Sequence, residues 1–420
     1  MAIPQTPTQK SAASIWARLP DALPFLFFAL LFAFTLKNPP LEAFDEFHYV
    51  TASKELINLE SNRNWEHPPL AKLIMGASWK LFTVELDWLN ELAAMRLMAV
   101  LFGMGVLAVF RLWCLQLGFS AAITRALVWT VGFNMAWYVQ SKTAMLDIFS
   151  LFFGLAGTLV AARAKRPAIA GVLLGLGMAC KWSALPFLLL AMWLARKAAP
   201  RQWAVAMTGA VLVYASAFIP LAMVKRAPVP PQYLHTYHQS RMLGGLQSTS
   251  DKAHSYRSNW WQWLTLNRPM WYTFSKAENV EPPQYHCVFM GGNPFIFWPG
   301  LLAILTLIAA WLRHRRRFPH RREALVLAFF AIPLLIWIPS PRKLMFFYYV
   351  IPSSLWFGPA IALALGKFMT EAKAERALWA VVILAGAFFF FMLPLLTGQA
   401  VSFEAFRTFY QPWMARLNWI

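Results

Sequence analysis

Long apolar segments recur along this chain and limit its fold more than any other feature. A bilayer core takes about 20 apolar residues to cross, and backbone groups without access to water must pair within the segment, which favours helices. The chain therefore reads as an all-α polytopic membrane protein with about 11 transmembrane helices. The candidate spans lie at 21–37, 93–115, 121–139, 144–162, 167–180, 183–196, 203–223, 294–312, 324–339, 344–366 and 377–396.

The composition agrees with this interpretation. The chain is 59% hydrophobic and 13% charged, whereas soluble domains are about 25% charged. A net charge of +20 would suggest nucleic acid in a soluble protein, but here much of it lies in short loops, so we expect no nucleic-acid partner. The three cysteines are odd in number and indicate neither a disulfide framework nor a metal site.

The distribution of lysine and arginine predicts the topology. Alternate gaps between the candidate spans carry clusters of basic residues, at 163–166, 196–201, 313–322 and 367–376. Basic loops stay on the cytoplasmic side, so we expect a cytoplasmic N-terminal segment at 1–20, a membrane domain at 21–396 and an external C-terminal segment at 397–420. The polar start of the chain lacks the apolar core of a cleavable signal peptide. The loops 41–92 and 225–293 and the turn 339–343 then share the outer face.

The two large outer loops differ in character. Around Lys54 and from Leu70 to Met75 the first loop has the pattern of short amphipathic helices lying along the interface. The second is rich in Pro, Trp, Tyr and His, with Trp260 and Trp261 in an aromatic cluster. Such rings favour the headgroup layer and also form platforms for a sugar face.

Asp45 and Glu46 follow the first apolar segment directly, in a chain that is poor in acids. The simplest interpretation is a solvated loop start. The flanking aromatic residues predict partial burial instead, and the rigid His67-Pro68-Pro69 stretch can return the chain to the pair. A partly desolvated carboxylate with a raised pKa suits a general base for a hydroxyl nucleophile.

Other charged residues lie near the same membrane face. Asp147 lies about one turn into a spanning helix, near its outer end, where an acid needs a partner. Arg96 and Lys181 lie at equivalent depths and could either pair with it or face a substrate. Arg342 and Lys343 form a cationic pair on the outer side, which is either a stray interfacial pair or a clamp for a phosphate.

A metal site has little support in the sequence. His48, His67, Glu46 and Glu66 could be assembled into one, but they lack dense ligand spacing. The sequence gives no firm prediction of a cofactor, and a divalent metal stays the less favoured alternative.

The order of several motifs resembles that of a known family. Its motifs are residues 44–49, 66–73, 140–142 with 145–147, 180–182, 255–263 with 268–269, 292–295 with Trp298, and 342–349. In this order they resemble the motifs of the protein O-mannosyltransferases, the dolichyl- or polyprenyl-phosphate-mannose-dependent group of the C-type membrane glycosyltransferases. The likeness runs from about residue 40 to 355.

The resemblance implies an enzyme that transfers mannose, with inversion, from a polyprenyl phosphate to Ser or Thr hydroxyls of translocated proteins. Asp45 would be the catalytic base and Glu46 its partner. The other residues implied in the acceptor or sugar site are His48, Glu66, His67, Asp147, Trp260, Trp261 and Asn293. Those implied in binding the lipid phosphate are Arg96, Lys181, Arg342 and Lys343.

The chain departs from the family pattern in places. Trp65 stands where the family usually has an acid two residues before the His of His-Pro-Pro, and Lys142 stands where Arg is common. The 225–293 loop is too short for the β-trefoil domain of eukaryotic members, which implies a bacterial member in the inner membrane with a periplasmic site.

Two other functions remain open at this level. The acceptor could be a glycolipid, lipid A or an envelope glycan, with the same donor chemistry. A lipid-sugar transporter or flippase would also use intramembrane charges, but it would usually show paired halves and broken midplane helices, and neither is visible here.

Overall fold

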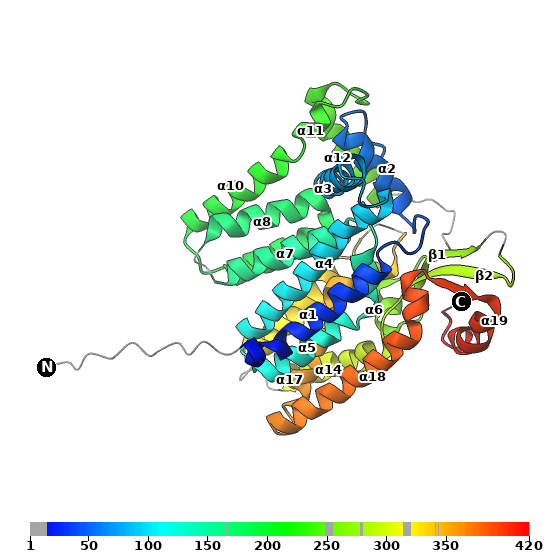
Figure 1. Cartoon of the computed structure of the whole chain (residues 1–420). Helices are drawn as coiled ribbons and strands as arrows, with labels where there is room; N and C mark the ends of the chain where they lie inside the picture. The colour runs from blue at the N-terminus through cyan, green and yellow to red at the C-terminus, as the bar shows by residue number, and fades with distance from the viewer. Residues whose placement is uncertain are drawn as a thin grey trace.

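The computed structural model describes residues 15–163, 166–247, 255–277, 280–313, 321–340, 342 and 344–419, and most of them are helical (Figure 1). The helices of the first half are α1 (Ile15–Thr35), α2 (Glu46–Ile57), α3 (Leu70–Trp79), α4 (Glu91–Gln116), α5 (Ala121–Gly132), α6 (Met135–Lys142), α7 (Asp147–Ala162), α8 (Pro167–Cys180), α9 (Leu185–Leu194) and α10 (Pro200–Ser216). Those of the second half are α11 (Ile219–Ala222), α12 (Leu234–Gln247), α13 (Trp260–Thr265), α14 (Pro294–Arg313), α15 (Arg321–Leu335), α16 (Ile351–Ser354), α17 (Phe357–Leu365), α18 (Glu371–Thr397), α19 (Phe403–Ala405) and α20 (Gln411–Arg416). The strands are β1 (Met270–Lys276), β2 (Gln284–Met290) and β3 (Ala400–Ser402).

All eleven ranges expected to span a membrane contain helix. Within the described residues, four helices are long and apolar enough to cross a bilayer by themselves, namely α4, α10 continued by α11, α14 and α18. The number rises to six if two bent pairs, α6 with α7 and residues 347–354 with α17, each count as one span. The remaining apolar helices, such as α5 and α8, are shorter. The polytopic helical fold is therefore present, and the count of eleven spans stays a prediction.

The bend between α6 and α7 places the carboxylate of Asp147 at the start of a helix. The two helices meet at 112° across a short break, and Asp147 is the first residue of α7. A carboxylate in the first turn is stabilised by the helix dipole and by the free amide groups there. The break also brings the backbone of Ala144 into the protein interior, where its N–H has a partner described below.

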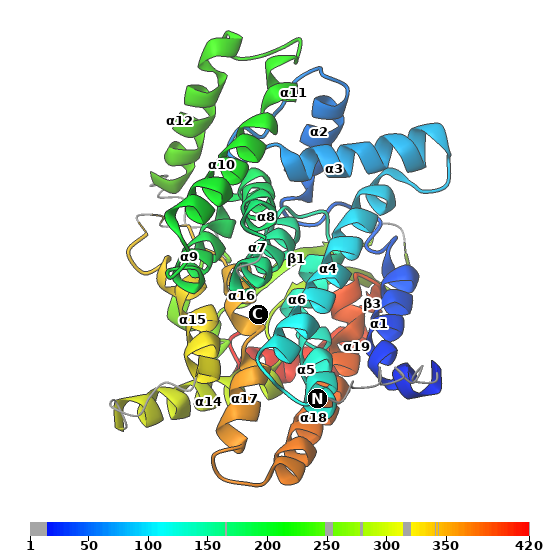
Figure 2. The same cartoon turned by 90° about the vertical axis from the view of Figure 1, so that its left-hand side faces the viewer.

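One end of the bundle carries the non-spanning elements (Figures 1 and 2). The two short helices expected in the first long loop are present as α2 and α3. The second long loop also forms strands that were not predicted: β1 pairs antiparallel with β2, and β2 with β3. Because β3 belongs to the C-terminal segment, that segment lies against the loop at 284–286.

Candidate active site

A cavity of about 640 Å³ lies where five parts of the chain meet at the α2–α3 end of the molecule. Its walls come from α2, from the turn before α3, from the α8–α9 junction, from α12 and from residues 336–349. Six residues singled out from the sequence line it: Asp45, His48, Glu66, His67, Lys181 and Arg342. Acids near the first apolar helix thus share a cavity with cations from two later segments.

Asp45 stands immediately before α2 and is half-buried at the cavity wall. Its Oδ2 atom accepts a long hydrogen bond of 3.4 Å from the Tyr49 hydroxyl. Burial raises the pKa of Asp45 above its ordinary value, although Lys181 and His48 act in the opposite direction. The side chain is thus a carboxylate of increased basicity that faces a space large enough for a substrate.

Lys181 shares the cavity lining with Asp45 and forms an ion pair with a second carboxylate. Its ammonium group lies 2.8 Å from Oδ2 of Asp147, which also accepts a hydrogen bond of 3.2 Å from Gln140. Asp147 lines a smaller cavity beside Tyr348 and Tyr349, whereas Lys181 lines the main one. The expected pairing of Asp147 is therefore present, and its partner is Lys181 rather than Arg96.

Arg342 enters the cavity from the turn that follows α15. Its Nε atom donates a hydrogen bond of 2.7 Å to the Leu344 carbonyl, and the guanidinium group lies 5.9 Å from the centre of the Tyr349 ring. It forms no ion pair with any acidic side chain of the described segments. These contacts orient the side chain and leave its charge available to a ligand. Lys343 lies outside the described residues.

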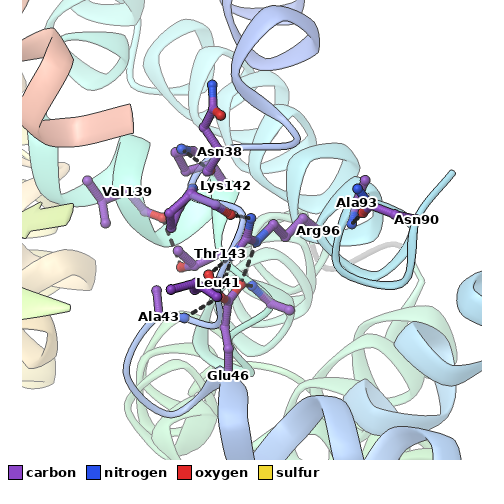
Figure 3. A network of polar contacts seen from close by, with 12 residues as sticks. Asn38, Leu41, Ala43, Glu46, Asn90, Ala93, Arg96, Val139, Lys142 and Thr143 are labelled. Carbon is purple, nitrogen blue, oxygen red and sulfur yellow. Dashed lines mark hydrogen bonds and ion pairs between the residues drawn. The ribbon is translucent and has the colours of Figure 1, made fainter. Parts of the chain in front are cut away.

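Glu46 and Arg96 do not line the cavity, because they face each other in the interior (Figure 3). Both side chains are fully buried, and Glu46 accepts bonds of 2.8 and 2.7 Å from Nε and Nη2 of Arg96. The backbone N–H groups of Ala43 and Ala144 donate to the same carboxylate, each at 2.7 Å. Burial alone would raise the pKa of Glu46, but Arg96 and these amides hold it below its ordinary value.

The same network continues beyond this pair. Arg96 also donates to the carbonyls of Pro39 and Leu41, and Lys142 donates to the carbonyl groups of Asn38 and Thr397. The two cations thus tie the chain before α2 to α4, α6 and the end of α18. This network has a structural role, because it provides hydrogen-bond partners for buried polar groups and leaves no charge free to bind a ligand.

Of the other residues proposed from the sequence, Glu66 lines the cavity, whereas Asn293, Trp260 and Trp261 do not. Glu66 is half-buried in the cavity wall and pairs with Arg241 of α12 at 2.5 Å. Asn293 is buried and donates to the carbonyls of Phe133 and Ala385, so it joins helices. Trp260 and Trp261 lie on α13 and are not among the residues that line the cavity.

Some residues that line the cavity were not among the site residues predicted from the sequence. Tyr49, Asn64, Trp182 and Trp337 also contribute to the cavity wall. Tyr49 could have been found, because it follows Asp45 by four residues and therefore lies on the same face of α2. In the part of the chain that the structure describes, no group of three His, Cys, Asp or Glu side chains could hold a metal ion.

Comparison with known proteins decides the family. A family model described as dolichyl-phosphate-mannose-protein mannosyltransferase matches residues 22–224, and one described as the C-terminal four TMM region of protein-O-mannosyltransferase matches residues 234–410. The chain belongs to the protein O-mannosyltransferase family. It is thus a polyprenyl-phosphate-mannose-dependent mannosyltransferase, a membrane glycosyltransferase.

Curated relatives and solved structures agree with this membership. The chain is 26% identical to the polyprenol-phosphate-mannose–protein mannosyltransferase of Mycobacterium tuberculosis, over 86% of this chain and 84% of that protein. It is 24% identical to the enzyme of the same name from Corynebacterium glutamicum, over 79% of this chain and 78% of that one.

Two solved structures share the fold. The S. cerevisiae Pmt1–Pmt2 complex bound to its sugar donor matches with a TM-score of 0.71 and 11% identity, over 92% of this chain and 91% of that chain. ArnT from Cupriavidus metallidurans bound to undecaprenyl phosphate matches with a TM-score of 0.55 and 15% identity, over 92% of this chain and 77% of that chain. At these identities the matches show a shared fold, and both neighbours agree with the membrane glycosyltransferase architecture expected from the sequence.

Proposed function

We propose that this mannosyltransferase moves a mannosyl group, with inversion, from a polyprenyl-phosphate carrier to a Ser or Thr hydroxyl of a translocated protein, on the outer face of a bacterial inner membrane. One observation carries the proposal: Asp45, Lys181 and Arg342 line one cavity of about 640 Å³. A base and two cations at one site suit the departure of a phosphate from a sugar. The curated relatives are named for a polyprenol-phosphate-mannose donor and a protein acceptor.

Asp45 is the base in this mechanism. It takes the proton of the acceptor hydroxyl as that oxygen attacks the anomeric carbon on the face opposite the phosphate. The new C–O bond forms while the bond from that carbon to the phosphate oxygen breaks, and the bonding pair leaves with the phosphate. The products are an inverted O-mannosyl group and a polyprenyl phosphate. The raised pKa of Asp45 favours the proton transfer.

Lys181 and Arg342 stabilise the leaving group. Negative charge grows on the phosphate in the transition state, and fixed cations in a partly water-excluded site offset it without reorganisation. Arg342 has no acidic partner in the described segments, so it supplies the larger free charge. Lys181 shares its charge with Asp147 at 2.8 Å, and that contact holds the ammonium group at the boundary between the two cavities.

The acceptor side is formed by the first long loop. His48, Asn64, Glu66 and His67 line the cavity beside Asp45, and they offer both donors and acceptors to a polar chain or a sugar. The distribution of basic residues predicts that residues 41–92 lie on the outer face, and this prediction supports an extracytoplasmic reaction.

The decisive experiment incubates membranes that contain the enzyme with polyprenyl-phosphate mannose labelled in the sugar. Label in protein that is released by β-elimination supports Ser or Thr acceptors. Label in lipid instead would favour a glycolipid acceptor. Movement of intact labelled donor across the membrane without any transfer would identify a flippase and overturn the proposal. Membranes with the Asp45→Asn variant serve as the matched control.

A further inference from the structure

A second polar cavity lies at the other end of the molecule, far from the active-site cavity. It measures about 380 Å³ and is formed where α4 and α17 end and where α5, α15 and α18 begin. In Figures 1 and 2, α5, α17 and the start of α18 lie toward the lower end of the bundle, away from α2 and α3. Because α4 and α18 are both long enough to cross a bilayer, their ends here lie at the level of the lipid headgroups.

Both signs of charge line this cavity. Among the described residues, its lining contains the cations Arg322 and Lys367 and the acids Glu323 and Glu371. Two of them already pair, since the Lys367 ammonium group lies 3.1 Å from Oε1 of Glu323. A ligand with one positive and one negative group would find an oppositely charged side chain for each.

Two side chains at this cavity, one acidic and one basic, each have a buried polar atom without a hydrogen-bond partner in the described structure. Glu323 is 7% exposed, and its second oxygen, Oε2, is buried without a hydrogen-bond partner in the described structure. The Nε atom of Arg322 is likewise buried and unpartnered there. Such groups are expensive to leave unsatisfied. One is an acceptor with negative charge and the other a donor with positive charge.

The environment of Arg322 suits a lipid rather than a free ion. Its guanidinium group lies 4.5 Å from the centre of the Phe119 ring, a cation–π contact that orients the group. Arg322 also lines an adjoining cavity of about 220 Å³ whose other walls include Trp113, Leu117 and Leu325. A polar chamber and a mostly apolar one therefore meet at a single arginine.

We propose that this cavity binds the headgroup of a zwitterionic phospholipid of the phosphatidylethanolamine class, with the phosphate on Arg322 and the primary ammonium on Glu323. An arginine in a pocket between membrane helices suits the phosphate of a lipid headgroup, and the acid beside it suits a headgroup that also carries a cation. The size lies within the range of about 300–1,000 Å³ typical of small-molecule sites. The inference is independent of the transfer reaction, because the two cavities lie at opposite ends of the bundle.

Native mass spectrometry of the full-length protein in detergent tests the proposal, with phosphatidylethanolamine and phosphatidylglycerol of identical acyl chains. We expect a Kd about tenfold lower for phosphatidylethanolamine. Arg322→Gln should weaken its binding at least about tenfold, whereas Arg376→Gln, an exposed arginine outside the cavity, should not. Glu323→Gln should remove the preference between the two lipids.

A change in the ligand covers the case in which Glu323→Gln does not fold. Phosphatidylcholine has no N–H donor for Oε2 of Glu323, so it should bind the unaltered protein more weakly than phosphatidylethanolamine. Equal binding of all three lipids, or unchanged binding by Arg322→Gln, would overturn the proposal. Displacement of the lipid by equimolar soluble O-phosphoethanolamine would show that the site takes a free phosphate compound instead. Bound lipid is read directly by mass, so failure of the transfer assay does not affect the result.

Discussion

The carboxylate of Glu46 receives two hydrogen bonds from the guanidinium group of Arg96, at 2.8 and 2.7 Å, and both side chains are fully buried. Asp45, one residue earlier, faces the active-site cavity. The two neighbouring acids therefore have different roles. Glu46 fixes the start of α2 to α4 and to the α6–α7 break, and this attachment holds Asp45 at the cavity wall.

Glu46→Gln should destabilise the protein, because it leaves the Arg96 charge buried without a counter-charge. The loss of one partner of a buried pair costs about 3–5 kcal/mol, which should lower the midpoint of thermal unfolding in detergent by several degrees. Glu91→Gln is the matched control, because Glu91 pairs with Lys54 at 2.7 Å where both side chains are partly exposed, and such pairs contribute about 0–1 kcal/mol. Equal midpoints for the two variants would refute the structural role of Glu46.

Asp45→Asn should abolish transfer and leave the fold intact, because the amide cannot accept the acceptor's proton. General-base catalysis contributes about 10²–10⁴-fold, and a loss of that size in kcat is expected in the labelled-donor assay. Asp87→Asn is a suitable control: Asp87 is exposed and has a φ of 52°, a conformation that Asn also tolerates. If Asp45→Asn retains turnover near that of the control, another residue must be the base.

The acid limb of the pH–rate profile should report Asp45. The base acts only when deprotonated, so kcat/KM should fall as the pH drops through the pKa of Asp45, which burial raises above its ordinary value. Lys181→Met should move this limb to higher pH, because Lys181 lowers that pKa and the freed Asp147 charge raises it. Lys54→Met, which alters a distant pair, should leave the limb in place. A limb that does not move in Lys181→Met argues against Asp45 as the titrating group.

Arg342→Gln should weaken the use of the donor. A hydrogen bond to a charged group contributes about 1.5–3 kcal/mol, so kcat/KM for the polyprenyl-phosphate sugar should fall by roughly 10–100-fold. The Ki of free polyprenyl phosphate, used as a competitive inhibitor, should rise in parallel. Arg226→Gln is the control, since Arg226 is exposed and does not line the cavity. An unchanged Ki for Arg342→Gln would place the phosphate elsewhere.

Much of the fold could be predicted from the sequence, because long apolar stretches and basic loops follow from the bilayer itself. The short amphipathic pattern from Leu70 likewise predicted a helix, which is present as α3. The sheet could not be predicted in this way. β3 has three residues, and it is formed by pairing with β2, more than 100 residues earlier.

The site was harder to predict, since adjacent residues on a helix point about 100° apart and the sequence does not say which one faces the interior. The partner of Glu46 is 50 residues away, so its burial depends on tertiary packing. The same holds for Asn293, whose amide was assigned to a ligand on resemblance but bonds the carbonyls of two helices. Asp147 was correctly expected to need a partner because its depth in the membrane made a lone charge expensive.

Lys72 gives the last prediction, because its buried amino group organises the turn that lines the cavity. It donates to Oδ1 of Asn62 at 3.2 Å and to the carbonyl groups of Asn64 and His67. Burial lowers the pKa of Lys72 to about 7, against a weaker opposite effect of Glu66. The unfolded chain therefore binds a proton at this site between pH 7 and its ordinary pKa near 10.5, while the folded protein does not.

The free energy of unfolding should therefore rise with pH between pH 7 and about 10.5, by up to about 1.4 kcal/mol per pH unit. Lys72→Met should flatten this rise between pH 7 and 10, and Lys54→Met should not; unfolding midpoints measured in detergent at each pH give the comparison. Lys72→Met should also reduce kcat/KM, because Asn64 and His67 lose their common donor and both line the cavity. The same slope in the variant and the unaltered protein would mean that Lys72 stays charged, and that its contacts with the three oxygens compensate for burial.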